Sequence, residues 1–344
     1  MSASISLGAL LALTGPEAAY ALQLRHAIAV AFEDALRPCD LIVADDHADP
    51  ARASDAAGRL ADDPRVVGVI GPMNSWTCET AGEIFAAAGL AHITPSASSV
   101  ALAGRGWQTF FRACPADDAQ ARVLAAVADR LLGARRVGAL DDCSSFAAPL
   151  CATFLAEAAG RGLAPVWHGA VQPDDPGALG RAADAAALSA LDAVLIAGLE
   201  EPCRRAARAL RDRGVRAAFL GTDAIKPTRA LRVEGFPGPW LTNSGTDARH
   251  QAPLFDARMR ARAGDHPSIY TVEAWEATGL LLGIVAGGAR TREMVRAALA
   301  ARTRADGPLA FGPKGERLDS RIGVYVDEET GPRFLANGAE LADA

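Results

Sequence analysis

Three acidic clusters are the residues of this sequence that could do catalytic chemistry. Asp45-Asp46-His47, Asp141-Asp142 and Glu200-Glu201 each follow an apolar run. Carboxylate and imidazole groups can bind a metal ion or exchange protons, so the first cluster could serve an enzyme. Acidic residues at strand ends are also common as solvated loop residues and as helix starts. We interpret the clusters in this second way, and an α/β enzyme that uses Asp45, Asp46 and His47 stays an open alternative.

The usual motifs of nucleotide-binding and hydrolytic enzymes are missing. No strand is followed by Gly-x-Gly-x-x-Gly, and neither a Gly-x-x-x-x-Gly-Lys-[Ser/Thr] loop nor a Gly-x-Ser-x-Gly elbow occurs. The histidines are scattered: His26, His47, His92, His168, His250 and His266. The cysteines form no Cys-x-x-Cys pair and are interpreted as small buried residues: Cys39, Cys78, Cys114, Cys143, Cys151 and Cys203. We therefore expect no catalytic residues, no cofactor and no metal.

Hydroxyl groups follow two of the apolar runs. Val66–Ile70 is followed by Gly71-Pro-Met-Asn-Ser75-Trp-Thr77, and Ala91–Ile93 is followed by Thr94-Pro-Ser96-Ala-Ser98-Ser. Ligands of open α/β sheets bind at such strand ends, where hydroxyls and the N–H groups of a helix N-terminus suit a carboxylate. Serines at these places can also be plain helix caps, and both interpretations stay open.

A carboxylate and several apolar side chains follow other runs. Asp223 comes directly after Phe219-Leu-Gly-Thr222, and Tyr20, Phe146 and Leu199 stand at comparable positions. Desolvating an ammonium group is costly unless a carboxylate meets it. Hydroxyls in one half of the chain, one acid in the other half and apolar walls between them would suit a small zwitterion.

Short apolar runs alternate with longer amphipathic segments along most of the chain. The runs expected to be strands are Ile5–Leu13, Leu41–Ala44, Val66–Ile70, Ala91–Ile93, Val137–Leu140, Val166–Ala170, Ala193–Ile196 and Ala218–Leu220. The segments expected to be helices are Tyr20–Leu36, Pro50–Ala61, Cys78–Ala88, Asp118–Leu132, Phe146–Gly160, Pro176–Leu188 and Pro202–Gly214. The alternation predicts an α/β fold with parallel sheets, in two series that divide near Cys114-Pro115.

The end of the chain breaks this alternation. Two helical segments, Ser268–Ala286 and Arg292–Arg302, have no strands of their own. They must therefore pack on a sheet formed earlier in the chain, which predicts a discontinuous domain. A β-like pattern follows at Leu309–Gly312, Ile322–Val326 and Phe334–Ala336.

Length and composition describe a folded chain of two domains. It has 344 residues, of which 50% are hydrophobic and 22% are charged, and one domain holds about 100–200 residues. Its 41 acidic and 35 basic residues leave a net charge of −6, which argues against a nucleic-acid partner. No apolar run reaches the length of about 18–20 residues that a membrane span needs. Ile5–Leu13 is interpreted as a strand and not as a secretory signal, because no basic residue precedes it.

The chain resembles the type I periplasmic binding proteins, and within them the leucine/isoleucine/valine-binding branch that serves ABC importers. The stretches that carry the resemblance are Asp45-Asp46-x-x-Asp49-Pro50, Gly71-Pro-Met-Asn-Ser75, Ile93-Thr-Pro-Ser-Ala-Ser98, Phe219-Leu-Gly-Thr-Asp223 and Pro267-Ser-Ile-Tyr270. They occur in the family's order and at similar spacings, from Ile5 to about Gly338.

The resemblance implies two Rossmann-like lobes joined by three hinge crossovers, with the ligand cleft between the lobes. The crossovers would lie near Ala113–Ala116, Asn243–Thr246 and Gly323–Val326. Residues 1–115 and 247–323 would form the N-terminal lobe, and residues 116–246 and 324–344 the C-terminal lobe.

The resemblance also implies roles for individual residues. Ser75, Ser96 and Ser98 would hold the α-carboxylate of an amino acid, with backbone contacts from Ala97, and Asp223 would hold its α-ammonium group. The wall of the side-chain pocket would be formed by Tyr20, Trp76, Phe146, Leu199 and Tyr270. Trp76 could instead pack outside the pocket.

Some residues depart from the family pattern. Phe146 replaces the usual tyrosine and Leu199 stands where an aromatic residue is common, so the second lobe's wall would be less polar. The two positions of the disulfide found in the amino-acid branch are occupied by Ala48 and Asn74, so we expect that disulfide to be absent.

The expected function is that of a periplasmic receptor that binds a hydrophobic amino acid by hinge closure and delivers it to the membrane permease subunits of an ABC importer. We expect a monomer and no enzyme activity. One alternative keeps the fold but changes the ligand to an amide, a urea-like compound or an aromatic carboxylic acid. A second places the module in the cytoplasm as a ligand sensor.

Overall fold

The computed structural model describes residues 4–15, 17–36, 38–144, 146–172, 174–225, 229–307, 309–319 and 321–342. The chain forms two compact units: residues 1–116 with 245–320 are unit 1, and residues 117–244 with 321–344 are unit 2. The chain therefore passes between the units three times, at 116/117, 244/245 and 320/321, and we call these points the three passages.

Unit 1 is built on a parallel sheet. In the described residues its strands are β1 (Ser6–Leu11), β2 (Asp40–Asp45), β3 (Val66–Ile70), β4 (His92–Thr94) and β5 (Phe110–Arg112), in the order β2-β1-β3-β4-β5. Leu7 and Leu11 of β1 point to one core cluster and Leu10 points to another, because neighbouring side chains of a strand face opposite ways. Both faces of this sheet are thus covered, as the continuous apolar runs predict.

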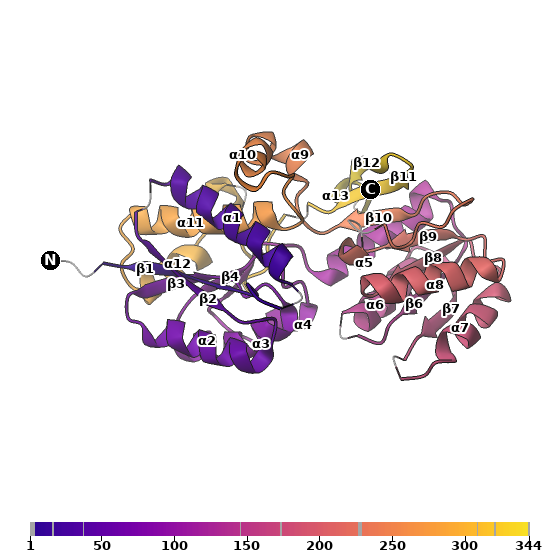
Figure 1. Ribbon diagram of the computed structural model, residues 1–344, viewed down its shortest axis with the longest axis horizontal. Coiled ribbons are helices and arrows are strands. Elements are labelled where there is room, and N and C mark those ends of the chain that lie inside the picture. Colours follow the sequence, from indigo (N-terminus) through magenta and orange to yellow (C-terminus); the bar gives the residue numbers. More distant parts are fainter. Residues whose placement is uncertain are drawn as a thin grey trace. The chain divides into compact units, whose positions relative to one another are not determined.

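Helices from both ends of the sequence cover the sheet of unit 1. They are α1 (Ala18–Asp34), α2 (Pro50–Asp62), α3 (Ser75–Ala87), α4 (Val100–Ala103), α9 (Ala248–Gln251), α10 (Pro253–Ala263), α11 (Thr271–Ala286) and α12 (Arg292–Ala300). Helices α1 and α11 lie side by side on one face, and α2 and α3 lie on the other (Figure 1). The late helices α11 and α12 therefore return to the first sheet, whereas their lack of strands had predicted only that they pack on a sheet formed earlier in the chain.

Unit 2 holds a larger, mixed sheet. Its described strands are β6 (Arg136–Asp141), β7 (Ala164–Ala170), β8 (Ala193–Ala197), β9 (Ala218–Gly221), β10 (Trp240–Asn243), β11 (Gly323–Glu328) and β12 (Gly331–Asn337). Their order is β12-β11-β10-β9-β8-β6-β7, and the pairs of β11 with β10 and with β12 are antiparallel while the others are parallel. The expected α/β class with largely parallel sheets is confirmed.

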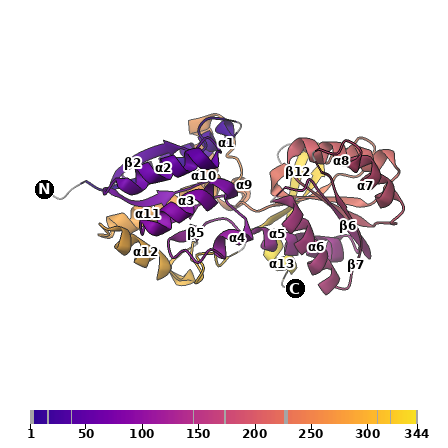
Figure 2. The same cartoon turned by 90° about the horizontal axis from the view of Figure 1, so that it is seen from below.

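The helices of unit 2 cover both faces of its sheet. They are α5 (Asp117–Ala126), which continues as a π-helical turn (Val127–Leu131), α6 (Ala147–Gly160), α7 (Ala178–Ala187), α8 (Glu200–Asp212) and α13 (Gly338–Ala342). Helices α5, α6 and α13 lie on one side and α7 and α8 on the other (Figure 2). No helix in the described part of the chain is long and apolar enough to cross a membrane.

Several elements differ from the expectation. Leu309–Gly312 forms no strand, because Phe311 makes only an isolated bridge with Arg317. Gly323–Val326, expected as a crossover, lies within β11. The elements that were not predicted are β5, β10, α4, α9, α10 and α13, and all of them except α10, with 11 residues, are five residues or shorter. Strands of three or four residues are too short to show a period of their own, and their neighbours in the sheet decide them.

Candidate functional site

The carboxyl ends of β3 and β4 bring the expected serines of unit 1 together. Helix α3 begins at Ser75, three residues earlier than the predicted start, so this serine lies in the first helical turn. The Ser99 backbone N–H donates to the Ser75 hydroxyl at 3.3 Å, and the Ser96 hydroxyl donates to the Met73 carbonyl at 2.7 Å. These contacts join the two serine-bearing loops into one surface.

Thr94 stabilises this surface from within. Its hydroxyl donates to the Pro72 carbonyl at 2.7 Å and accepts the Ala97 backbone N–H at 2.9 Å. Ala97 and Ser98 are buried beside it, while Ser96 is half-buried. Sequence reasoning did not single out Thr94, although it opens the Thr-Pro-Ser stretch that carried the resemblance.

The N-terminus of α3 has no side-chain cap in the described structure. Asn74 occupies the N-cap position but makes no capping hydrogen bond, and its buried Oδ1 has no hydrogen-bond partner. The first N–H groups of a helix lack intrahelical acceptors and carry a partial positive charge. This end of unit 1 is therefore suited to an anion such as a carboxylate.

The aromatic residues of unit 1 fall into two kinds. Tyr20 is half-buried on α1 and Tyr270 is buried just before α11, with a left-handed φ of 64°. Both pack against the core of unit 1. Trp76 is 44% exposed, and its indole N–H donates to the Ala48 carbonyl at 2.9 Å. Its nitrogen is thus held by the loop after β2, which favours the interpretation that the ring packs outside a pocket.

Unit 2 places a buried carboxylate at the end of β9. Asp223 begins a short 3-10 helix (Asp223–Ile225) and is 7% exposed. Its Oδ1 accepts a hydrogen bond of 2.6 Å from Nε2 of Gln120, a fully buried residue of α5. The amide of Gln120 orients this carboxylate, and a buried carboxylate is a suitable partner for a cationic group. Sequence reasoning missed Gln120, whose only signal is an amide among the buried apolar residues of α5.

The two apolar residues expected in unit 2 differ in burial. Phe146 is partly buried against the core beside the start of α6. Leu199 is 65% exposed at the N-cap of α8, and its N–H donates to Asp142 at 3.1 Å. Leu199 also lines a cavity of about 410 Å³ together with Cys143, Val171 and Leu179.

The acidic clusters make local contacts. Asp45 accepts hydrogen bonds from the Thr14 hydroxyl and the His47 backbone, and these bonds lower its pKa although partial burial opposes them. Asp46 accepts the Ala48 N–H, and burial raises its pKa. Asp141 accepts the Cys143 N–H at 2.8 Å. The described residues include no group of three or more His, Cys, Asp or Glu that could hold a metal ion. These contacts support the interpretation as loop acids, and Glu200 and Glu201 begin α8, but Asp46 and Asp141 are buried and not solvated as expected.

The six cysteines, all of them in the described residues, are free thiols. Cys78, Cys151 and Cys203 are buried, and burial raises the pKa of each thiol. A raised thiol pKa disfavours the reactive thiolate, so these residues behave as small core side chains.

Comparison with known proteins identifies the family. Residues 4–321 match the family described as periplasmic binding protein, and the chain belongs to it. The Leu/Ile/Val-binding protein BraC3 of Rhizobium johnstonii is 25% identical over 343 residues, which cover 94% of this chain and 91% of the relative. The expected resemblance to the leucine/isoleucine/valine-binding branch is confirmed.

Solved structures agree with the fold. A leucine-binding protein, LivK, from Thermotoga maritima superposes with a TM-score of 0.81 at 20% identity, covering 96% of this chain and 98% of that one. A solute-binding protein of an ABC transporter from R. palustris, in complex with benzoate, superposes with a TM-score of 0.79 at 16% identity, covering 97% and 96%. At these identities the likeness concerns the fold.

Proposed function

We propose that this protein is an extracytoplasmic receptor that binds a hydrophobic amino acid, branched-chain or aromatic, and delivers it to the membrane permease subunits of an ABC importer. Membership of the periplasmic binding protein family supports this proposal, as do relatives that are named Leu/Ile/Val-binding proteins. The receptor works as a monomer, without a cofactor, and it is not an enzyme.

One observation carries the proposal: the two units offer opposite polarities. Unit 1 has an uncapped helix N-terminus beside a cluster of serines, which suits an anion. Unit 2 has a buried carboxylate oriented by a neutral amide, which suits a cation. An amino acid carries both charges, so neither unit alone satisfies it. Ligand binding then favours the arrangement in which both units contact it, which is hinge closure.

The roles follow from these polarities. Ser75, Ser96 and Ser98 hold the α-carboxylate, with the backbone of Ala97, and Asp223 holds the α-ammonium group. The apolar wall comes from the remaining candidates, Tyr20, Phe146, Leu199 and Tyr270. Trp76 is left out of this wall, because its indole N–H donates to the Ala48 carbonyl and its ring packs outside the pocket.

The second candidate ligand is an aromatic carboxylic acid. The specific observation in its favour is the apolar character of the wall in unit 2, where Phe146 and Leu199 offer no hydroxyl group. The anion site of unit 1 would serve such an acid equally well, while Asp223 would face a ligand that has no cation to offer.

Calorimetric titration with a matched ligand series distinguishes the two candidates. The series contains leucine, 4-methylpentanoate, which lacks the amino group, and 3-methylbutylamine, which lacks the carboxylate. Phenylalanine and benzoate form the aromatic arm. The proposal expects an amino acid to bind about 100-fold or more tightly than its single-charge analogues, since each loses one paired charge. Equal binding of the acid and the amino acid would favour the second candidate.

A further inference from the structure

A buried arginine in unit 1 lies where all three passages leave that unit. Arg317 stands three residues before the end of the segment 245–320, and its side chain is almost fully buried. Its Nη1 donates to the Ala113 carbonyl at 2.6 Å, and Ala113 lies three residues before the first passage. Arg317 itself lies close to the third passage. Its guanidinium group therefore connects the segment beside the third passage to the segment beside the first.

Three carboxylates surround this guanidinium group. Its Nε donates to Asp319 at 2.7 Å, its Nη2 lies 3.4 Å from Glu276 of α11, and its Nη1 lies 3.9 Å from Glu273 of the same helix. A guanidinium group has five N–H donors in a rigid plane, so it can bind several acceptors at fixed angles. Arg317 thus ties both outer chain segments to the first turns of α11.

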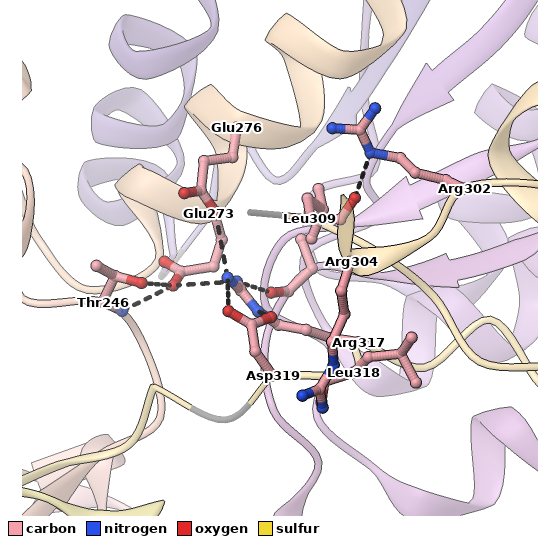
Figure 3. A network of polar contacts seen from close by, with 10 residues as sticks. Thr246, Glu273, Glu276, Arg302, Arg304, Leu309, Arg317, Leu318 and Asp319 are labelled. Atoms are coloured by element: carbon pink, nitrogen blue, oxygen red, sulfur yellow. Dashed lines mark hydrogen bonds and ion pairs between the residues drawn. The ribbon is translucent and has the colours of Figure 1, made fainter. Parts of the chain in front are cut away.

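Glu273 connects the second passage to the same cluster. Its Oε1 accepts the backbone N–H of Thr246 at 2.7 Å and the Thr246 hydroxyl at 2.6 Å, and Thr246 is the second residue after the passage at 244/245. Figure 3 shows the Glu273 carboxylate between Thr246 and Arg317, with Asp319 below the guanidinium group. Burial raises the pKa of Glu273, while Arg317 and Thr246 oppose this effect.

The cluster also lies next to a candidate ligand residue. Gly245, the first residue after the second passage, packs so closely on Tyr270 that an added Cβ would lie 2.8 Å from the Tyr270 nitrogen. Tyr270 directly precedes α11, which carries Glu273 and Glu276. A movement of the second passage would therefore displace Tyr270, and a movement of Tyr270 would displace the passage.

We propose that Arg317 and Glu273 are positioning residues for ligand binding: they hold the three passages as one body on α11 and so couple the orientation of Tyr270 to hinge closure. This inference rests on the proposed function, because it presupposes a hinge that closes on a ligand and states which residues fix that hinge to unit 1. Without the contacts of Arg317 and Glu273 the three passages move independently, so the unliganded protein populates more conformations. Ligand binding then costs more conformational entropy, and the affinity falls.

The test compares Arg317→Lys with the matched control Arg292→Lys. Arg292 also donates to four backbone carbonyls of unit 1, those of Ala61, Asp63, Val66 and Ala88, and none of these lies beside a passage. A lysine keeps the charge but loses the fixed fork of donors. Both variants should lose stability, so stability alone does not decide.

Two measurements separate positioning from mere stability. In the unliganded protein, amide hydrogen exchange should rise in Arg317→Lys at all three passages, residues 113–117, 243–247 and 317–323, and stay unchanged there in Arg292→Lys. Leucine affinity, measured where both variants are fully folded, should fall about 5- to 150-fold in Arg317→Lys only. Faster exchange confined to residues 317–319, or equal affinity loss in the two variants, would overturn the proposal.

Two milder variants serve if Arg317→Lys does not fold. Thr246→Val removes one hydrogen bond to Glu273 at constant shape, and Gly245→Ala presses a methyl group on Tyr270 without changing any charge. Each should weaken leucine binding and raise exchange at residues 113–117, beside the first passage. Unchanged exchange there would overturn the proposal. The exchange experiment needs no ligand, so it is decided even if the wild-type protein binds none of the proposed amino acids.

Discussion

Replacing Asp223 by asparagine tests the central charge pair of the proposed site. The substitution keeps the size of the side chain and an oxygen that can accept the hydrogen bond from Gln120, which is 2.6 Å long in the wild-type protein. It removes the negative charge and replaces one acceptor oxygen by an NH2 donor. Because Asp223 is 7% exposed, water cannot replace that charge effectively for a bound ammonium group.

The expected magnitude follows from this burial. Breaking a buried ion pair costs about 3–5 kcal/mol, and about 1.4 kcal/mol corresponds to a tenfold change in Kd. Asp223→Asn should therefore weaken leucine binding by about two to four powers of ten. Binding of 4-methylpentanoate should not weaken, because this ligand has no ammonium group to lose its partner.

Calorimetric titration of both ligands measures these changes. Asp184→Asn is the matched control, since Asp184 is 69% exposed and pairs with Arg213 on the surface of unit 2. Its leucine Kd should stay within about twofold, because surface pairs contribute at most about 1 kcal/mol to stability and none to a distant site. If Asp223→Asn bound leucine within about threefold of the wild-type protein, the assignment of Asp223 to the ammonium group would be refuted.

Three further predictions concern other parts of the chain. Gln120→Leu should weaken leucine binding by about tenfold or more in the same titration, because Asp223 loses a hydrogen bond of a charged group; an unchanged Kd would contradict its orienting role. Burial lowers the pKa of His92 to about 3, so below pH 6.5 the unfolded chain takes up a proton that the folded protein refuses. The free energy of unfolding should fall by about 2 kcal/mol from pH 7 to pH 5 through this residue, and urea titrations of His92→Phe should lack that component. Gly82→Ala should lower the free energy of unfolding by about 1–2 kcal/mol in urea, because the new Cβ would lie 2.3 Å from the Trp107 ring; an unchanged midpoint would mean that the ring moves freely.

The local sequence pattern was sufficient to predict an element where the residues of that segment alone show that it is buried. Val66–Ile70 is a strand with the predicted bounds, since five continuous apolar residues fit a strand covered on both faces. The late helices were assigned to an existing sheet for a similar reason, because an apolar helix face must be buried on some sheet, and the family resemblance pointed to the first lobe. Strand ends also follow from local pattern, so the stretches around Ser75, Ser96 and Asp223 were found directly.

The partners of these residues were beyond the reach of local pattern. Gln120 lies 103 positions from Asp223, and Thr94 contacts Pro72 across 22 positions. Trp76 was left open because nothing in its neighbourhood specifies that its nitrogen reaches Ala48. Such pairs form only when the folded unit brings together strand ends, loops and helix starts that lie far apart in the sequence, and the packing of the whole unit sets that arrangement.

The sequence by itself determined the class of fold, the strand ends that carry hydroxyls and a carboxylate, and the family. Periodicity and residue type are properties of short segments. Because apolar surface must be buried, they can be interpreted from one sequence alone. Only the tertiary structure decided that Ala113, Thr246, Glu273 and Arg317 form one cluster. These residues come from four separate segments, and a buried guanidinium group binds whatever acceptors the completed fold places around it.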